Sequence, residues 1–220
     1  MKELAVRLLA SYLVGSIMGG LVIGWRRGVD IRALGSGNAG ATNALRTQGR
    51  GFALGVVAID IAKGWVATRI IPGVPLGLPV PDSLVHNWLP SACGAAAMLG
   101  HVYPLWFGFR GGKAVATLIG VLLGLAPILL AGFLATWVVV VCITGFVSLA
   151  SVLAACSLPL ELVVLHMTWI TPYVALAWFA ALLILYTHRG NLRRIVRRRE
   201  PRARRLWLLG ARPASFKESR

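Results

Sequence analysis

The segment from Arg32 to Arg46, RALGSGNAGATNALR, gathers residue types that bind anions. Its glycines let backbone N–H groups approach an anion without an intervening side chain. If a helix begins near Ala41, Arg46 shares a face with Thr42 and can hold a phosphate through two parallel hydrogen bonds. The alternative is a glycine-serine loop closed by an Asn or Thr N-cap. The candidate phosphate-binding residues are Gly35, Gly37, Asn38, Gly40, Thr42 and Asn43, with Ser36 as a further hydroxyl donor.

A second glycine-rich segment, FRGGKAVAT, runs from Phe109 to Thr117. A nucleotide-binding P-loop needs glycine where Phe107 stands and Ser or Thr where Ala114 stands, so the pattern excludes that site. What remains is a turn whose Lys113 opens an apolar helix. This pattern fits a phosphate cradle and, equally, a tight interhelical turn flanked by cations. The candidate phosphate-binding glycines are Gly108, Gly111 and Gly112.

The third polar segment, YTHRGNLRRIVRRRE, follows the last long apolar run. His188 and Asn191 are three residues apart and therefore share one face of a helix. A histidine at a membrane edge can be a base, an anion ligand or an ordinary interfacial side chain. His101, at the inner end of an earlier apolar run, is a candidate supporting residue. No spacing of His, Cys, Asp or Glu predicts a bound metal.

Two charged residues, Asp60 and Lys63, stand inside an apolar run. Charges within a membrane span are costly and normally pair with one another or serve a site. Three residues apart, they share a helical face and can form a local ion pair. Directed into a helical bundle near its inner edge, the same pair can hold a polar site together. A supporting role is therefore expected for both residues.

The composition is that of a membrane protein. The chain has 220 residues, is 57% hydrophobic, has a mean hydropathy of +0.75 and carries a net charge of +16. The 73 residues from Ala114 to Tyr186 include a single formal charge, Glu161. Water-soluble cores do not need such a run, whereas bilayer spans of about 20 apolar residues do. The sequence predicts an all-α integral membrane protein with one polytopic domain, residues 1–200, and a basic cytoplasmic tail, residues 201–220.

Positive charge concentrates toward the C-terminal end. Residues 189–220 hold 12 Lys and Arg against two Glu, which gives +10 of the net +16. A basic end can indicate nucleic-acid binding. Cytoplasmic flanks of membrane proteins are rich in Lys and Arg, however, and the inner leaflet is anionic. The lipid bilayer is therefore the expected partner of this tail, and no nucleic-acid partner is predicted.

Seven spans account for the hydropathy pattern. The first three are expected at Leu4–Ile23, Phe52–Ile71 and Ser91–Phe107. Four more of about 18 residues fit between Ala114 and Tyr186, because two would be far longer than a bilayer is thick. The turns between these four are expected near Gly132, Ser148–Ser151, and Pro159 or Thr171–Pro172.

Loop charges predict the orientation. Basic loops belong on the cytoplasmic side, which places Arg26–Arg50, Arg110–Lys113 and the tail inside. The connection Pro72–Pro90 has no Lys or Arg and is expected outside with the N-terminus. All three polar segments then lie on the cytoplasmic side, in short re-entrant or glycine-rich loops and at the end of the last span.

Three motifs in this order resemble those of the bacterial acyl-phosphate:glycerol 3-phosphate acyltransferases. They are GSGNAGATNALR (Gly35–Arg46), GHVYPLWFGFRGGKAVAT (Gly100–Thr117) and HRGNLRRI (His188–Ile195). The likeness covers nearly the whole chain to about Glu200, and DIAKG (Asp60–Gly64) is also similar to a family segment. Two positions depart from the family, which usually has glycine at Ala114 and frequently proline at Ala39.

The resemblance implies transfer of a fatty acyl group from acyl phosphate to the sn-1 hydroxyl of glycerol 3-phosphate. The products would be lysophosphatidic acid and phosphate, in phospholipid synthesis at the bacterial cytoplasmic membrane. The family uses no metal, no nucleotide and no acyl-CoA, so no cofactor is expected. The loop Gly108–Lys113 would bind the phosphate of glycerol 3-phosphate. The residues implied to be catalytic are Ser36, Arg46, Lys113, His188 and Asn191.

The residues leave two questions open. The proton of the attacking hydroxyl can pass to His188, whose unperturbed pKa is about 6.5, or to a substrate phosphate. A carrier for an organic phosphate would also use glycine-rich breaks and intramembrane charge. The crowding of polar segments on one face, and the lack of a repeat between the two halves, favour the enzyme.

Overall fold

Every regular element in the described part of the chain is helical. The computed structural model describes residues 2–76, 84–166, 172–204 and 206–209. Short 3-10 helices, η1 (Ile31–Ala33), η2 (Ile71–Gly73) and η3 (Leu105–Phe107), lie in the connections. The α-helices are α1 (Lys2–Gly15), α2 (Gly19–Arg26), α3 (Ala41–Gln48), α4 (Arg50–Arg69), α5 (Leu84–Val102), α6 (Val115–Leu125), α7 (Pro127–Thr144), α8 (Val147–Val164) and α9 (Pro172–Val196).

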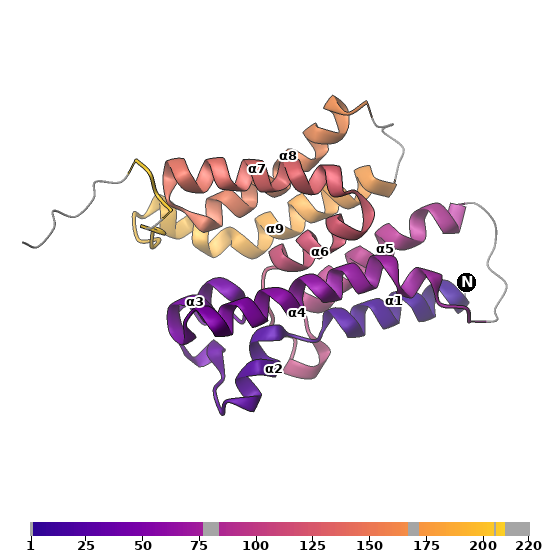
Figure 1. The fold of residues 1–220 in the computed structure, drawn as a ribbon, viewed down its shortest axis with the longest axis horizontal. Helices are drawn as coiled ribbons and strands as arrows, with labels where there is room; N and C mark the ends of the chain where they lie inside the picture. The colour runs from indigo at the N-terminus through magenta and orange to yellow at the C-terminus, as the bar shows by residue number, and fades with distance from the viewer. Residues whose placement is uncertain (1, 77–83, 167–171, 205, 210–220) are drawn as a thin grey trace, which may run out of the picture.

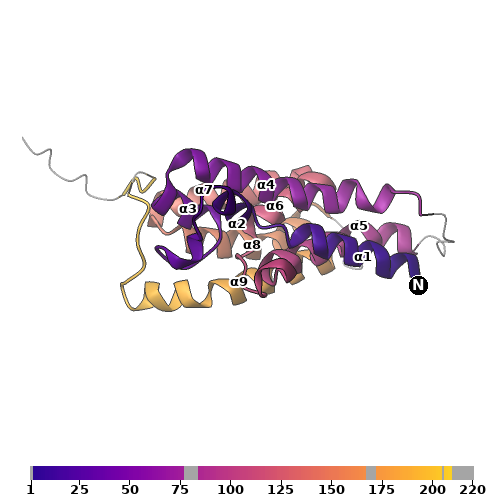
Figure 2. The ribbon, with the colours of Figure 1, turned by 90° about the horizontal axis from the view of Figure 1, so that it is seen from below.

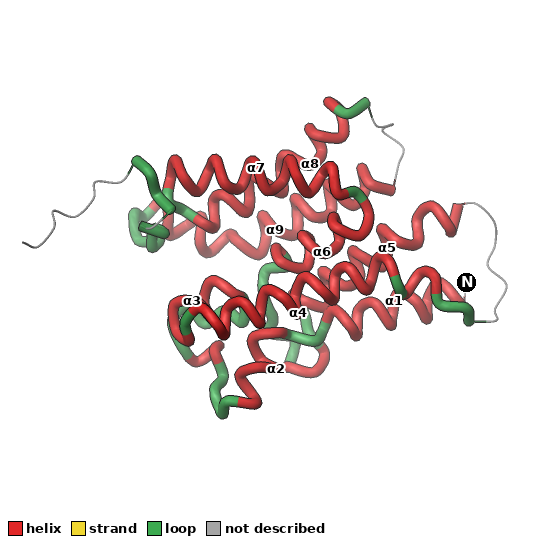
Figure 3. The backbone as a smooth tube through the Cα atoms, viewed as in Figure 1, coloured by secondary structure: helices red, strands yellow, loops and turns green. Residues whose placement is uncertain are grey.

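The long helices run side by side in two groups (Figure 1). Helices α1, α4 and α5 form one group, and α7, α8 and α9 form the other. The short helix α6 lies between the groups and packs most extensively against α4. Helices α2 and α3 and the end of α9 lie at one end of the bundle, while the N-terminus lies at the other (Figure 2). The first polar segment and the end of α9, which carries the third, therefore lie toward the same end of the bundle (Figure 3).

Within the described residues, three helices, α7, α8 and α9, are long and apolar enough to cross a membrane, with 18, 18 and 25 residues. A fourth span is possible if α1 and α2, which meet at 50°, count as one broken span. The predicted number of seven is therefore not confirmed among the described residues. Helix α6 has only 11 residues, or roughly 16 Å at 1.5 Å per residue, about half of a bilayer core. Helix α4 has 20 residues, but four of them are charged, and it is not among the helices that are apolar enough to cross a membrane.

Several predicted boundaries are wrong. The expected first span, Leu4–Ile23, is interrupted between Gly15 and Gly19. Helix α5 begins at Leu84, within the connection expected at Pro72–Pro90, and ends at Val102 instead of Phe107. Part of that connection, 77–83, lies outside the described residues, as does Thr171.

The turns predicted within the long apolar stretch are displaced as well. The breaks fall at Ala126 and at Gly145–Phe146, and Ser148–Ser151 follows the second break as part of α8. Gly132 and Pro159 lie inside α7 and α8. A Cβ at Gly132 would overlap the Glu161 carboxylate of α8, so this glycine permits close helix packing and does not mark a turn. Pro172 does open α9, as expected from its fixed φ.

Candidate active site

One pocket of about 300 Å³ receives residues from all three polar segments. Its polar wall comes from the α2–α3 connection, α3, the loop before α6, and the end of α9. Its apolar wall comes from α4, α6, α7 and α8. The predicted site residues that line it are Ser36, Asn38, Gly40, Thr42, Asn43, Arg46, Asp60, His101, Lys113, His188 and Asn191. The predicted residues Gly35, Gly37, Lys63, Gly108, Gly111 and Gly112 are not among the lining residues.

The side chain of Asn43 organises the first segment. Its Nδ2 donates to the carbonyls of Ile31, Leu34 and Asn38 at 2.9, 3.0 and 2.9 Å. Its Oδ1 accepts from the backbone N–H of Ser36 at 2.9 Å. Asn43 is 2% exposed, so this amide replaces the regular backbone pairing that the loop lacks. The Asn43 amide is thus committed to the protein, although part of the residue lines the pocket.

Helix α3 begins at Ala41, as predicted, and its first turn faces the pocket. Its N-cap, Gly40, has no side chain, and no side-chain hydrogen bond closes the helix start. Gly40 instead donates its own N–H to Asn38 Oδ1 at 2.8 Å. The first turn of a helix presents free N–H groups and positive potential, which suit an anion. The exposed side chain of Arg46, one turn further along, lines the same pocket.

The glycines of the second segment have a different use from the one predicted. The N–H groups of Gly111 and Gly112 donate to the carbonyls of Val102 and His101, at 3.2 and 3.0 Å, and thereby cap the end of α5. A Cβ on Gly112 would overlap the imidazole of His101. These glycines press the loop onto α5 and leave Lys113, at the start of α6, as the residue of the loop that reaches the pocket.

Lys113 contacts an amide and not a carboxylate. Its Nζ donates to Asn191 Oδ1, a hydrogen bond that joins the second and third polar segments. Burial lowers the pKa of Lys113 to about 8; the nearby cations Arg194 and Arg46 act in the same direction, while Glu200 opposes them. The ammonium therefore gains from any anion that enters the pocket.

His188 is 4% exposed and held in one orientation. Its Nδ1 lies 2.9 Å from the carbonyl oxygen of Ile184. Because a carbonyl only accepts, Nδ1 must carry the proton, and Nε2 of the neutral ring keeps its lone pair. His188 therefore has the tautomer that a base requires, in the wall of the pocket.

Glu200 is a pocket residue that the sequence did not single out. Its side chain is 4% exposed. Its Oε1 accepts from Asn191 Nδ2 at 2.7 Å and Ser148 Oγ at 3.0 Å, and its Oε2 accepts from Arg194 Nε at 2.8 Å. In sequence it looks like one acidic residue in an arginine-rich run, so no local pattern could reveal it.

The segment after Glu200 packs back onto the bundle. Ala203 N–H donates to the Gly145 carbonyl at 2.7 Å, and Leu208 N–H donates to the Cys142 carbonyl at 2.9 Å. The indole N–H of Trp207 donates to the Ile143 carbonyl at 3.0 Å. These three carbonyls belong to the last turn and C-cap of α7, where helical partners are lacking. We call the described residues 200–204 and 206–209 the strap.

The pair Asp60–Lys63 secures the break in the first apolar run. Lys63 Nζ lies 2.8 Å from Asp60 Oδ1 and donates to the Ile17 carbonyl at 2.9 Å. Asp60 Oδ1 also accepts from the N–H of Gly19, the first residue of α2, at 3.3 Å. His101 Nδ1 lies 3.6 Å from the same oxygen. The pair is local, as the spacing allowed, and its charges supply the backbone partners that the break removes.

Comparison with known proteins agrees with this architecture. The family described as "Glycerol-3-phosphate acyltransferase" matches residues 5–198. The glycerol-3-phosphate acyltransferase of Parasynechococcus marenigrum (strain WH8102) is 43% identical over 201 residues, covering 90% of this chain and 89% of the relative. That of Bacillus subtilis (strain 168) is 39% identical over 206 residues, covering 93% and 99%.

Two crystal structures have the same fold. The integral membrane glycerol 3-phosphate acyltransferase PlsY (YgiH), in its glycerol 3-phosphate form, superposes with a TM-score of 0.78 at 36% identity, covering 90% of this chain and 94% of that one. The lysophosphatidic acid form of PlsY superposes with a TM-score of 0.77 at 34% identity, covering 92% and 97%. The protein described here therefore belongs to the glycerol-3-phosphate acyltransferase family, as an integral membrane acyltransferase of phospholipid synthesis.

Proposed function

We propose that this enzyme transfers a fatty acyl group from acyl phosphate to the sn-1 hydroxyl of glycerol 3-phosphate, releasing 1-acyl-glycerol 3-phosphate and phosphate. The proposal rests on one observation: the pocket has a polar, cationic wall and an apolar wall. Cations, amides and two helix starts form one wall, and apolar side chains form the other. Both substrates carry a phosphate, and one of them also carries a fatty tail.

Two helix starts match two phosphates. The first turns of α3 and α6 both contribute to the pocket, and neither has a side-chain cap. Each is an anion site by its free N–H groups and its dipole. Lys113 with Asn191 accompanies α6, and Arg46 with Ser36 accompanies α3. We assign the phosphate of glycerol 3-phosphate to Lys113 and the phosphate of the acyl donor to Arg46 and Ser36.

In this proposal the glycines before α3 and α6 shape the loops that position these two helices. Gly111 and Gly112 use their N–H groups on α5, so we assign them the positioning of Lys113 in place of direct phosphate contact. Gly108 has a φ of +65° after η3 and lets the loop reverse. Gly35 and Gly37, with φ of +57° and +72°, shape the turn that presents Ser36.

The chemistry needs little more than alignment and charge. An acyl phosphate is already activated, so the hydroxyl oxygen attacks the acyl carbon and the phosphate leaves with the bonding electrons. Alignment of two bound reactants supplies roughly 7–11 kcal/mol of the barrier reduction. Each well-placed donor to developing charge adds about 2.7–4 kcal/mol. His188 Nε2 accepts the hydroxyl proton in this proposal, with a substrate phosphate as the competing acceptor.

The apolar wall suits the acyl chain. It contains Val57, Val115, Ala116, Ile119, Phe133, Leu134, Trp137 and Val147. Trp137 is oriented by a hydrogen bond from its indole N–H to Ser151 Oγ at 3.2 Å. We propose that the fatty tail lies against this wall while the phosphates remain at the wet end.

The setting follows from the same arrangement. We propose seven membrane passages, with α6 completing its passage together with neighbouring helices, in the bacterial cytoplasmic membrane. The pocket and residues 201–220 face the cytoplasm, and the N-terminus lies outside. Residues 1–200 form the acyltransferase domain. The basic surface after α9 contacts the anionic inner leaflet.

The test is reconstitution of the purified protein with acyl phosphate and labelled glycerol 3-phosphate. We expect labelled lysophosphatidic acid, acylated at the sn-1 position, and no product when acyl-CoA replaces acyl phosphate. Arg46→Met should reduce kcat/KM by about a hundredfold. Arg50→Met, at the exposed start of α4 and outside the pocket, is the matched control. Product formed equally well from acyl-CoA would refute the assignment of the donor.

A further inference from the structure

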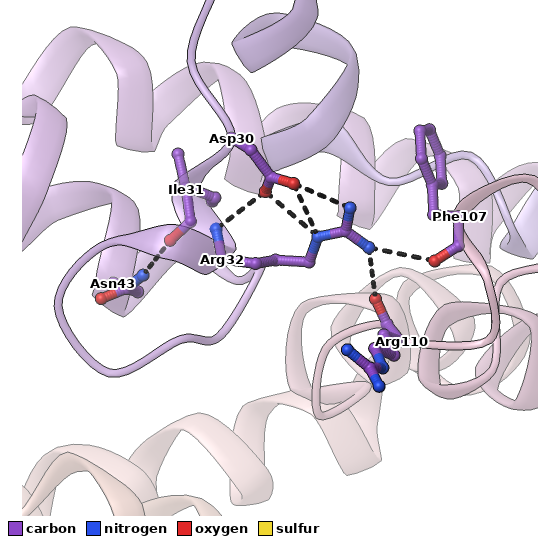
Figure 4. Close-up of polar contacts among 6 residues, drawn as sticks. All are labelled: Asp30, Ile31, Arg32, Asn43, Phe107 and Arg110. Atoms are coloured by element: carbon purple, nitrogen blue, oxygen red, sulfur yellow. Dashed lines mark hydrogen bonds and ion pairs between the residues drawn. The ribbon is translucent and has the colours of Figure 1, made fainter.

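The side chain of Arg32 joins the first polar segment to the second (Figure 4). Its Nε and Nη2 contact the carboxylate of Asp30, with Nη2 2.8 Å from Oδ2. Its Nη1 donates to the carbonyls of Phe107 and Arg110, at 3.0 and 3.4 Å. One planar guanidinium thus contacts two carbonyls that lie 75 and 78 residues further along the sequence.

The backbone that carries Arg32 is hydrogen-bonded to α3. Asn43, on α3, donates to the carbonyl of Ile31, the residue before Arg32, at 2.9 Å (Figure 4). Asp30 accepts the N–H of Arg32 at 2.9 Å and closes the start of η1. The backbone that carries Arg32 is therefore fixed to the helix whose first turn lines the pocket.

The loop that Arg32 contacts continues along the chain to Lys113. Arg110 is three residues before Lys113, and the intervening glycines are hydrogen-bonded to the end of α5. Phe107 also packs against the buried cluster that contains Met18 and Ile31. Arg32 therefore holds the backbone of this loop from the α3 side, three residues before Lys113, while α5 holds it at the two glycines.

We propose that Arg32, supported by Asp30, is a positioning residue that sets the distance between the α3 wall and Lys113. Arg32 acts through the loop and does not touch substrate, since it is not among the residues that line the pocket. The inference rests on the proposed function, in which the two walls hold the two phosphates.

Arginine is the residue type that this geometry requires. Its five donors in a rigid fork engage a carboxylate on one edge and carbonyls on the other, which a lysine ammonium cannot do at once. The hydrogen bonds from Arg32 hold the pKa of Asp30 below its usual range, so the pair is ionised at neutral pH. The side chains of Arg32 and Asp30 are 28% and 47% exposed, so a substitution leaves no buried charge behind.

The experiment combines kinetics with a distance measurement. Spin labels are placed at Leu34 and Phe109, which are 39% and 55% exposed on the two connected segments. The two cysteines that a label could reach are replaced, as Cys142→Ser and Cys156→Ser. Cys93 is kept, because it is buried and not available for labelling. Arg32→Gln is compared with Arg32→Lys, Asp30→Asn and the control Arg26→Gln, an exposed arginine at the end of α2.

For Arg32→Gln we expect a broadened distance distribution and a KM for glycerol 3-phosphate about five- to tenfold higher, with kcat changed less than about twofold. Arg32→Lys should fail to restore either quantity, and Arg26→Gln should match the wild type. An unchanged distance distribution, an unchanged KM, or full rescue by lysine would each overturn the proposal. If Arg32→Gln does not accumulate as folded protein, the proposal is tested with Asp30→Asn, which should also broaden the distance distribution and raise the KM for glycerol 3-phosphate. An inactive wild type would instead refute the proposed function, and the distances would still test the contact.

Discussion

Two lysines of this protein, Lys63 and Lys113, are used in opposite ways. Lys63 lies inside the bundle, 2.8 Å from the carboxylate of Asp60, and donates to the Ile17 carbonyl. Lys113 lies in the pocket wall and donates to Asn191, a neutral amide. The first ammonium is neutralised by the fold. The second keeps its charge available for a ligand, and burial lowers its pKa to about 8 as a consequence.

The difference separates charges that build the fold from charges that act on substrates. An ammonium has three donors, and Lys63 directs its own at the Asp60 carboxylate and the Ile17 carbonyl, both groups of the protein. The amide partner of Lys113 holds the side chain in place but does not cancel its charge. A phosphate entering the pocket would therefore add a strong charge-assisted hydrogen bond to Lys113.

Removal of the pocket ammonium should abolish most activity without unfolding the protein. For Lys113→Met we expect kcat/KM to fall by about a hundred- to a thousandfold, the usual effect of losing one preorganised donor. The thermal unfolding midpoint should stay close to that of the wild type, because no buried carboxylate loses its partner. Steady-state kinetics and thermal unfolding in detergent measure both. Near-normal kcat/KM would show that Lys113 is only part of a turn.

Removal of the buried ammonium should have the reverse profile. Lys63→Met removes the lysine partner of the buried Asp60 carboxylate, and breaking a buried ion pair from one side costs about 3–5 kcal/mol. We expect a large loss of thermal stability and of folded yield, with a normal KM for glycerol 3-phosphate in the protein that remains folded. The double variant Asp60→Asn/Lys63→Met is the control and should recover part of the stability. A stable Lys63→Met enzyme with a raised KM would place Lys63 in the site after all.

The pH dependence should report the pocket lysine. Lys113 is protonated below its pKa of about 8 and loses its charge above it. We therefore expect kcat/KM for glycerol 3-phosphate to decline as the pH rises through about 8, approaching tenfold per pH unit. In Lys113→Arg, which stays charged, this decline should disappear, although KM at neutral pH should rise because a guanidinium presents its donors differently. A decline that persists in Lys113→Arg would belong to another group.

Loss of the strap should weaken the site moderately. Because the rest of the strap holds Glu200 against Asn191, the partner of Lys113, we expect truncation after Glu200 to lower kcat/KM about three- to tenfold. Truncation after Leu209 keeps every described strap contact and is the control. Equal activity of the two truncated proteins would contradict this role.

The smallest effect is expected at Ala114, between Lys113 and α6. This buried alanine has a φ of +64°, in the left-handed region that favours glycine. Ala114→Gly removes that strain but also a buried methyl group, and it increases the entropy of the unfolded chain. We expect a change in unfolding free energy within about 1 kcal/mol, with activity preserved. A larger change, measured by denaturant unfolding in detergent, would mean that the loop before α6 adopts another backbone conformation.

The sequence was informative about residue types and poor at geometry. The helical membrane class and the start of α3 followed from hydropathy and from the polar segment itself. The breaks between α6, α7 and α8 did not, because Pro127 and Gly145, which mark them, resemble Pro159 and Gly132, which lie inside helices. Gly132 illustrates the problem, since a glycine for helix contact and a glycine for a turn look alike in sequence.

The pocket shows the same limit. The sequence named Lys113, His188 and Asn191, yet not Glu200, which reaches the pocket only because the strap folds back onto α7. It also named Gly111 and Gly112 as anion ligands, although their N–H groups serve α5. Where a backbone N–H points depends on tertiary contacts, and those contacts are not encoded in the local pattern.

The position of the strap in the chain has a consequence for biogenesis. Glu200 and Pro201 line one side of the pocket, and they follow all nine described α-helices in the order of synthesis. A nascent protein whose helices have already entered the bilayer therefore still has an incomplete catalytic chamber. Translation must proceed past Leu209 before this enzyme can reach its full activity.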